Sequence, residues 1–89
     1  MSNQDEMDAL FGEIKAELGR ARAKFPGDNV TLAALMEEVG ELAKATFEEP
    51  RDRVRAEAVQ VAVMACRMVL DGDNTYEPWR KSRGLDPLV

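Results

Sequence analysis

The 89-residue length corresponds to one domain, so residues 1–89 are taken as a single unit. The sequence is 45% hydrophobic and 33% charged, which is the balance of a globular protein rather than a disordered one. One cysteine and no histidine exclude an intrachain disulfide, a Cys/His zinc site and a histidine-assisted nucleophile. Any catalysis must therefore rest on carboxylates, amides, basic groups and a hard metal ion.

The charge and the apolar pattern also limit the partners. A net charge of −5 disfavours binding to a nucleic-acid polymer. No apolar run approaches the roughly 20 residues that cross a bilayer, so a membrane partner is not expected. The N-terminal residues are polar and acidic and do not resemble a secretory signal, which favours a cytoplasmic location.

The first predicted helix spans residues 5–24, where apolar residues recur at spacings of three and four. Pro26 and Gly27 end it. The second predicted helix runs to about Glu49, with Asn29 or Thr31 as its cap. Its apolar residues also fall on one side of a helical wheel.

The third predicted helix spans residues 50–71, with Pro50 in its first turn and Gly72 as its C-terminal stop. Apolar residues cover about two-thirds of its circumference. Two partner helices cannot cover such a helix, so we expect self-association as a homodimer or homotetramer, with burial of the spare face against an unrelated protein as the alternative. The remaining polar strip is narrow and carries Arg53, Glu57, Gln60, Arg67 and Asp71.

A short C-terminal segment follows Gly72. It contains basic residues and Trp79, which is expected to pack on the body or on a neighbouring subunit. The sequence therefore predicts an all-α protein of three main helices plus this segment, with a helical bundle that oligomerisation completes.

Two pairs of oxygen-bearing side chains carry the predicted chemistry. Glu38 and Glu41 are three residues apart on the second helix, so the two anions are neighbours. Mg²⁺ favours carboxylate oxygens and would remove their repulsion. Glu57 and Gln60 repeat the spacing on the third helix. If the two helices are antiparallel, the four side chains can converge, as in metal sites of helical bundles.

Both motifs together resemble a known family. Glu37-Glu38-x-x-Glu41, a spacer and Glu57-x-x-Gln60 are similar to the EExxE and ExxD motifs of MazG-like members of the all-α nucleoside triphosphate pyrophosphatase superfamily. The flanking words, residues 32–43 and 57–65, resemble it too. The similarity covers about half of the chain.

The resemblance implies a helical, oligomeric enzyme that hydrolyses nucleoside triphosphates, often deoxy or non-standard ones, to monophosphate and pyrophosphate. It implies that Glu38, Glu41 and Glu57 are metal ligands and that Glu37 is a catalytic carboxylate that orients water. Mg²⁺ is the expected cofactor, with Mn²⁺ as a substitute. Gln60 departs from the family's Asp: its amide oxygen can ligate Mg²⁺ with one charge fewer, or it can read the base or sugar.

Other readings remain open. The acidic residues of the second helix can be a solvated face, and Glu57 can simply pair with Arg53. Arg67 is a candidate substrate-binding residue through phosphate, but it can instead pair with Asp71. At the level of function, the alternatives are a non-catalytic helical module that binds nucleotide or protein without turnover, and a purely structural oligomer.

Overall fold

In the computed structural model, which describes residues 2–27 and 30–86, every regular element is helical. Helix α1 spans Asn3–Lys24, α2 Thr31–Glu48 and α3 Arg51–Leu70. A 3₁₀ turn, η1 (Asn74–Tyr76), leads into the short helix α4 (Glu77–Ser82). The predicted all-α class and the three main helices are therefore confirmed. None of the described helices is long and apolar enough to cross a membrane.

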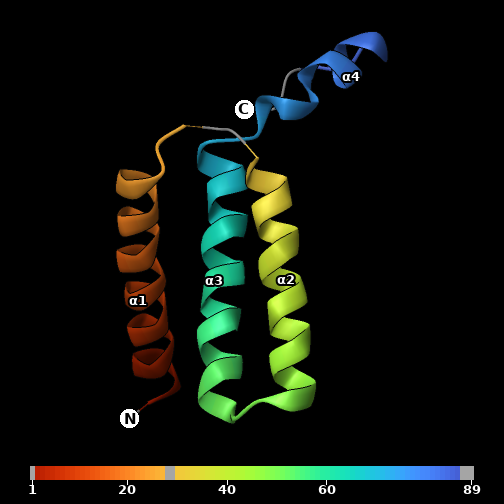
Figure 1. Cartoon of the computed structure of the whole chain (residues 1–89). Coiled ribbons are helices and arrows are strands. Elements are labelled where there is room, and N and C mark those ends of the chain that lie inside the picture. The colour runs from red at the N-terminus through yellow and green to blue at the C-terminus, as the bar shows by residue number, and fades with distance from the viewer. Residues whose placement is uncertain (1, 28–29, 87–89) are drawn as a thin grey trace.

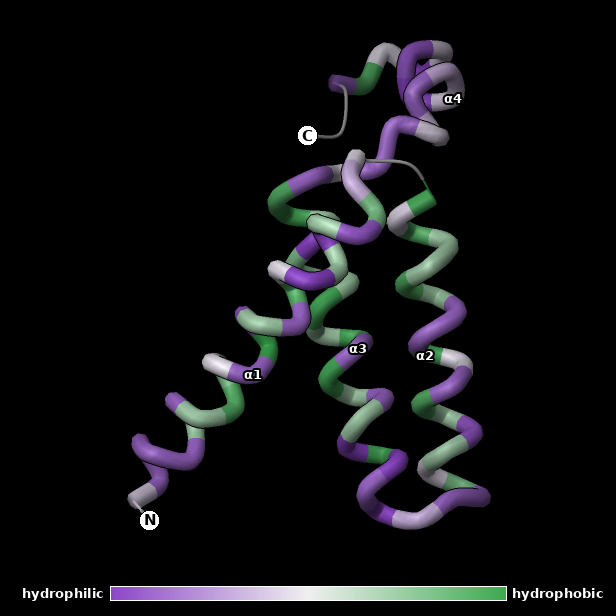
Figure 2. The backbone as a smooth tube through the Cα atoms, turned by 60° about the vertical axis from the view of Figure 1, so that its left-hand side comes forward, coloured by the Kyte–Doolittle hydropathy of each residue, from purple (hydrophilic) through white to green (hydrophobic). Residues whose placement is uncertain are grey.

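The three long helices run up, down and up, with α3 in the middle (Figure 1). Among the described elements, α3 packs against both α1 and α2, and those two do not contact each other. The α2–α3 pair is an antiparallel hairpin closed at Glu49 and Pro50, and α1 is inclined to it (Figure 2). The result is an open arrangement around α3 rather than a closed bundle.

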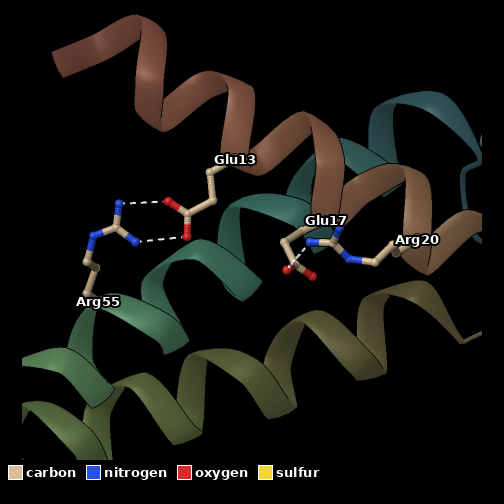
Figure 3. Close-up of polar contacts among 4 residues, drawn as sticks. All are labelled: Glu13, Glu17, Arg20 and Arg55. Atoms are coloured by element: carbon tan, nitrogen blue, oxygen red, sulfur yellow. Dashed lines mark hydrogen bonds and ion pairs between the residues drawn. The ribbon is translucent and has the colours of Figure 1, made fainter. Parts of the chain in front are cut away.

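The apolar core is small and lies between α2 and α3. Among the described residues, its fully buried members are Ala45, Val59 and Val63. No residue of α1 is buried, although Leu10, Ile14 and Leu18 are half-buried. Helix α1 is also tied to α3 by a two-pronged ion pair, in which both terminal nitrogens of Arg55 donate to Glu13 at 2.7 and 2.9 Å (Figure 3).

The two ends of the α2–α3 pair are built differently. At the closed end, Pro50 is the cap of α3, where its missing N–H is not needed. At the open end, α3 stops at Gly72, whose φ of 70° is left-handed and which donates its N–H to the carbonyl of Arg67. The predicted stop at Gly72 is thus confirmed.

The cap of α2 differs from the prediction. Asn29 lies outside the described residues, and Thr31 is the first residue inside the helix, so its prediction as the cap is wrong. Val30 occupies the cap position and supplies no side-chain acceptor. The backbone N–H of Leu32 instead donates to the carboxylate of Asp73, at 2.7 Å. Asp73 follows the C-terminal end of α3.

The C-terminal segment extends away from the body (Figure 1). Helix α4 packs against η1 and against no other described element. Trp79 is exposed, with the guanidinium of Arg83 5.3 Å from its ring. Packing of Trp79 on its own body is therefore not observed, which leaves the neighbouring-subunit alternative.

Candidate functional site

The α2–α3 hairpin brings together three of the predicted carboxylates. Glu38 and Glu41 project from adjacent turns of α2, and Glu57 projects from α3. One oxygen from each lies within 4.8 Å of the others. This happens because the helices are antiparallel, so the polar strip of α3 passes the acidic turn of α2. The span suits the ligand shell of one hard cation.

Burial differs sharply across this acidic triad of Glu38, Glu41 and Glu57. Glu57 is only 8% exposed, Glu38 is half-buried and Glu41 is exposed. The Oε2 atom of Glu38 is buried, and no donor among the described residues bonds to it. A buried acceptor without a partner is costly, and a cation would satisfy it. The donor set therefore fits a divalent cation.

The electrostatics of the triad centre on Glu38. Burial, together with the neighbouring Glu41 and Glu57 carboxylates, raises the pKa of Glu38 from 4.5 to about 7. Both causes act in the same direction, because desolvation and like charges each disfavour the ionised form. A cation in the triad would reverse the effect of the like charges.

One basic side chain contacts the triad directly. The Nη2 atom of Arg53 donates to Oε1 of Glu57 at 2.5 Å, and its Nε lies 3.8 Å from Glu49. The ion pair that was the alternative reading of Glu57 is therefore present, alongside the triad. The same Glu57 carboxylate therefore accepts from Arg53 and has an oxygen within 4.8 Å of the carboxylates of Glu38 and Glu41.

A pocket of roughly 350 Å³ adjoins the triad, and Glu38 belongs to both. It lies where the C-terminal end of α1 approaches the first turns of α2 and the second half of α3. Apolar side chains form much of its wall, and Gln60 and Arg67 also line it. The described lining is Ala21, Phe25, Val30, Thr31, Ala34, Glu38, Gln60, Met64 and Arg67.

Arg67 is a structural part of this pocket. Its side chain is buried, its Nε donates to Asp71 at 3.2 Å, and its Nη2 donates to the carbonyls of Phe25 and Gly27 at 2.6 and 3.1 Å. The alternative pairing with Asp71 is thus observed. These bonds hold the chain after α1 against α3 and shape the pocket wall. A contact between Arg67 and substrate stays a prediction.

Two predicted site residues, Glu37 and Gln60, are not members of the triad. Glu37 is exposed and is not one of the three clustered carboxylates. Its role as a catalytic carboxylate stays a prediction. Gln60 is half-buried and lines the pocket with Glu38, so it is near the triad rather than on a separate surface.

Two features of the site could not be found by the sequence reasoning. The pocket uses Val30, which lies just before α2 where a wheel gives no guidance, and Phe25, which belongs to the apolar stripe of the first predicted helix but which the stripe does not assign to a pocket. The unsatisfied oxygen of Glu38 depends on side-chain packing rather than on spacing.

Comparisons of this chain with protein-family models, with curated proteins and with solved structures found no match.

Proposed function

We propose that the protein is a Mg²⁺-dependent nucleoside triphosphate pyrophosphohydrolase of the MazG-like type, acting on deoxy or non-standard nucleotides. The observation that carries the proposal is the triad of Glu38, Glu41 and Glu57, whose oxygens lie within 4.8 Å of one another at the edge of a pocket. The unpartnered oxygen of Glu38 supports a cation there. The EExxE-like spacing of the sequence supports the reaction class.

In this proposal the triad would hold Mg²⁺, with Mn²⁺ as a substitute. The bound ion would neutralise phosphate charge and polarise the bond that breaks. Gln60 would contribute its amide oxygen to the metal or to the base or sugar. The pocket beside Glu38 would hold the nucleoside, with Arg67 in its wall. Glu37 would orient water toward the phosphorus nearest the sugar, so that pyrophosphate leaves.

The proposal extends to self-association. A compact monomer of 9.9 kDa exposes about 5,200 Å². This chain exposes 6470 Å². The excess exceeds the ~800 Å² that each partner buries in a standard interface. We propose that a homodimer or homotetramer covers this surface, in a cytoplasmic location where nucleotides are the substrates.

The experiment is nucleotide turnover with Mg²⁺ or Mn²⁺ across canonical and modified triphosphates, with monophosphate and pyrophosphate identified by chromatography. Glu38→Gln and Glu41→Gln should each lower kcat/KM by about a hundredfold or more, because each removes a proposed ligand. Glu48→Gln is the matched control, since it neutralises an exposed carboxylate at the far end of α2. Equal turnover in all four proteins would refute the site.

The rival is a binding module that has lost turnover, and Gln60 is the observation that favours it, because the amide removes one charge from the proposed ligand set. Magnesium-dependent nucleotide binding without products would support the rival. Gln60→Asp then separates the two readings: it should create turnover in a protein that had lost it for this reason. A structural oligomer predicts no response to metal or nucleotide in either protein.

A further inference from the structure

Arg53 is placed unlike the other cations near the proposed site. Its side chain is 52% exposed, yet its guanidinium contacts the most buried member of the triad, Glu57. The contact with Glu49 is looser, at 3.8 Å. Glu57 is one turn further along α3 and Glu49 lies in the link between α2 and α3, so the guanidinium can turn between them without moving the backbone.

Two other arginines near the site already donate their hydrogen bonds to other groups of the protein. Arg67 is buried, and its guanidinium donates to Asp71 and to two backbone carbonyls. Arg55 makes the two-pronged pair with Glu13 on the other side of α3. Arg53 therefore combines contact with the triad and access to solvent, and a guanidinium matches phosphate oxygens in a two-pronged geometry.

We propose that Arg53 is an exchangeable counter-ion of the site. It neutralises Glu57 in the metal-free protein and turns to the substrate's phosphates when a divalent cation takes that carboxylate. The inference rests on the proposed function. Its physical basis is that the Glu57 carboxylate cannot neutralise both the guanidinium and a divalent metal ion, and that a metal at Glu57 repels the guanidinium. The Arg53 side chain is 52% exposed, so water can solvate the guanidinium when it leaves Glu57, whose carboxylate then takes the metal in its place.

The proposal predicts opposite effects on two ligands. Arg53→Gln should bind Mn²⁺ about three to ten times more tightly, because a competing cation is gone. The same variant should bind inorganic tripolyphosphate, in the presence of Mn²⁺, about ten times more weakly, because a phosphate contact is gone. Arg53→Lys keeps the charge without the two-pronged geometry and should fall between wild type and Arg53→Gln for tripolyphosphate.

The matched control is Arg51→Gln, which removes an exposed charge from the first turn of the same helix and should change each affinity by less than about twofold. Mn²⁺ binding is followed by electron paramagnetic resonance of the free ion, and tripolyphosphate binding by calorimetry. If Arg53→Gln weakens both ligands, Arg53 is a brace for Glu57 and the proposal is overturned. If Arg53→Gln changes neither the Mn²⁺ affinity nor the tripolyphosphate affinity, Arg53 has no part in binding either ligand and the proposal is overturned as well.

These outcomes are distinct from failure of the proposed function. Wild-type protein that binds no Mn²⁺ would remove the metal site, and the counter-ion role with it. Wild-type protein that binds Mn²⁺ and hydrolyses nucleotides, with Arg53→Gln unchanged in both affinities, would remove the counter-ion role alone.

Discussion

At the scale of single residues, Glu38 has an acid–base environment that links stability to pH. Its pKa is raised from 4.5 to about 7 by burial and by Glu41 and Glu57. A carboxyl whose pKa is higher in the folded than in the unfolded state holds its proton more tightly when folded. Its contribution to stability is therefore present at low pH and declines as pH rises from about 4.5 to about 7.

We accordingly predict that metal-free wild type is less stable at pH 8 than at pH 5, because the Glu38 contribution is lost over this range. Glu38→Gln should flatten the dependence and be the more stable protein at pH 8. Mg²⁺ should restore wild type at pH 8 but not the variant. Urea midpoints at both pH values, with chelator or with Mg²⁺, measure this, and Glu48→Gln is the control. A wild type that is more stable at pH 8 without metal would contradict the prediction.

The convergence of the triad was predictable from residue spacing, given one assumption about direction. Glu38 and Glu41 lie one helical turn apart, and an antiparallel hairpin then brings Glu57 to them. Spacing also predicted that Arg53 pairs with Glu57. Spacing could not reveal that this ion pair and the triad coexist, because that depends on how the side chains pack between the two helices.

At the scale of helices, the start of α2 depends on a residue far along the chain. Asp73 is fully buried and accepts hydrogen bonds from the backbone N–H of Leu32 and from Thr75. Burial alone would raise the pKa of Asp73, but the hydrogen bonds from Thr75 and Leu32 outweigh it, and the pKa is lowered. The charged carboxylate is thus the stabilising form.

Asp73→Ala should destabilise the protein by about 1–3 kcal/mol, because it removes the cap of α2 and leaves an unpaired N–H. Asp73→Asn should cost less, since its amide oxygen can still accept. Because the pKa is lowered on folding, the contribution should be full above about pH 4 and be lost as pH falls further. Urea unfolding at pH 7 and pH 3 measures both effects. Asn74→Ala, at an exposed neighbour, is the control, and an equal loss there would refute the capping role.

The helix bounds could be predicted because apolar periodicity and the breakers at Pro26, Pro50 and Gly72 are local signals. The cap of α2 could not, because Asp73 and Leu32 meet only after α3 has returned the chain to the same end of the molecule. The direction of α4 could not be predicted either. It depends on how the chain leaves Gly72, beside the buried Asp73, rather than on a pattern within α4.

At the scale of the whole molecule, α2 carries an exposed apolar stripe. Met36, Val39 and Phe47 share one side of the helix and are exposed, Phe47 to 87%. Ala45, which is buried against α3, lies on the opposite side of the helical wheel. The apolar circumference of α3 was the basis for predicting oligomerisation from the sequence. The structure shows exposed apolar residues on α2 as well.

If a second copy covers this stripe, a charge placed at its most exposed residue, Phe47, should dissociate the assembly, because a buried unpaired charge is strongly unfavourable. We predict that Phe47→Glu shifts the protein from oligomer to monomer, with at least about a hundredfold weaker self-association. Glu48→Lys changes the charge of the next residue, which is exposed and points about 100° away from Phe47 and outside the stripe, and it should change self-association much less. Sedimentation equilibrium over a concentration series measures both. Wild type that remains monomeric at high concentration, or equal dissociation by both variants, would show that the stripe is not the interface between copies.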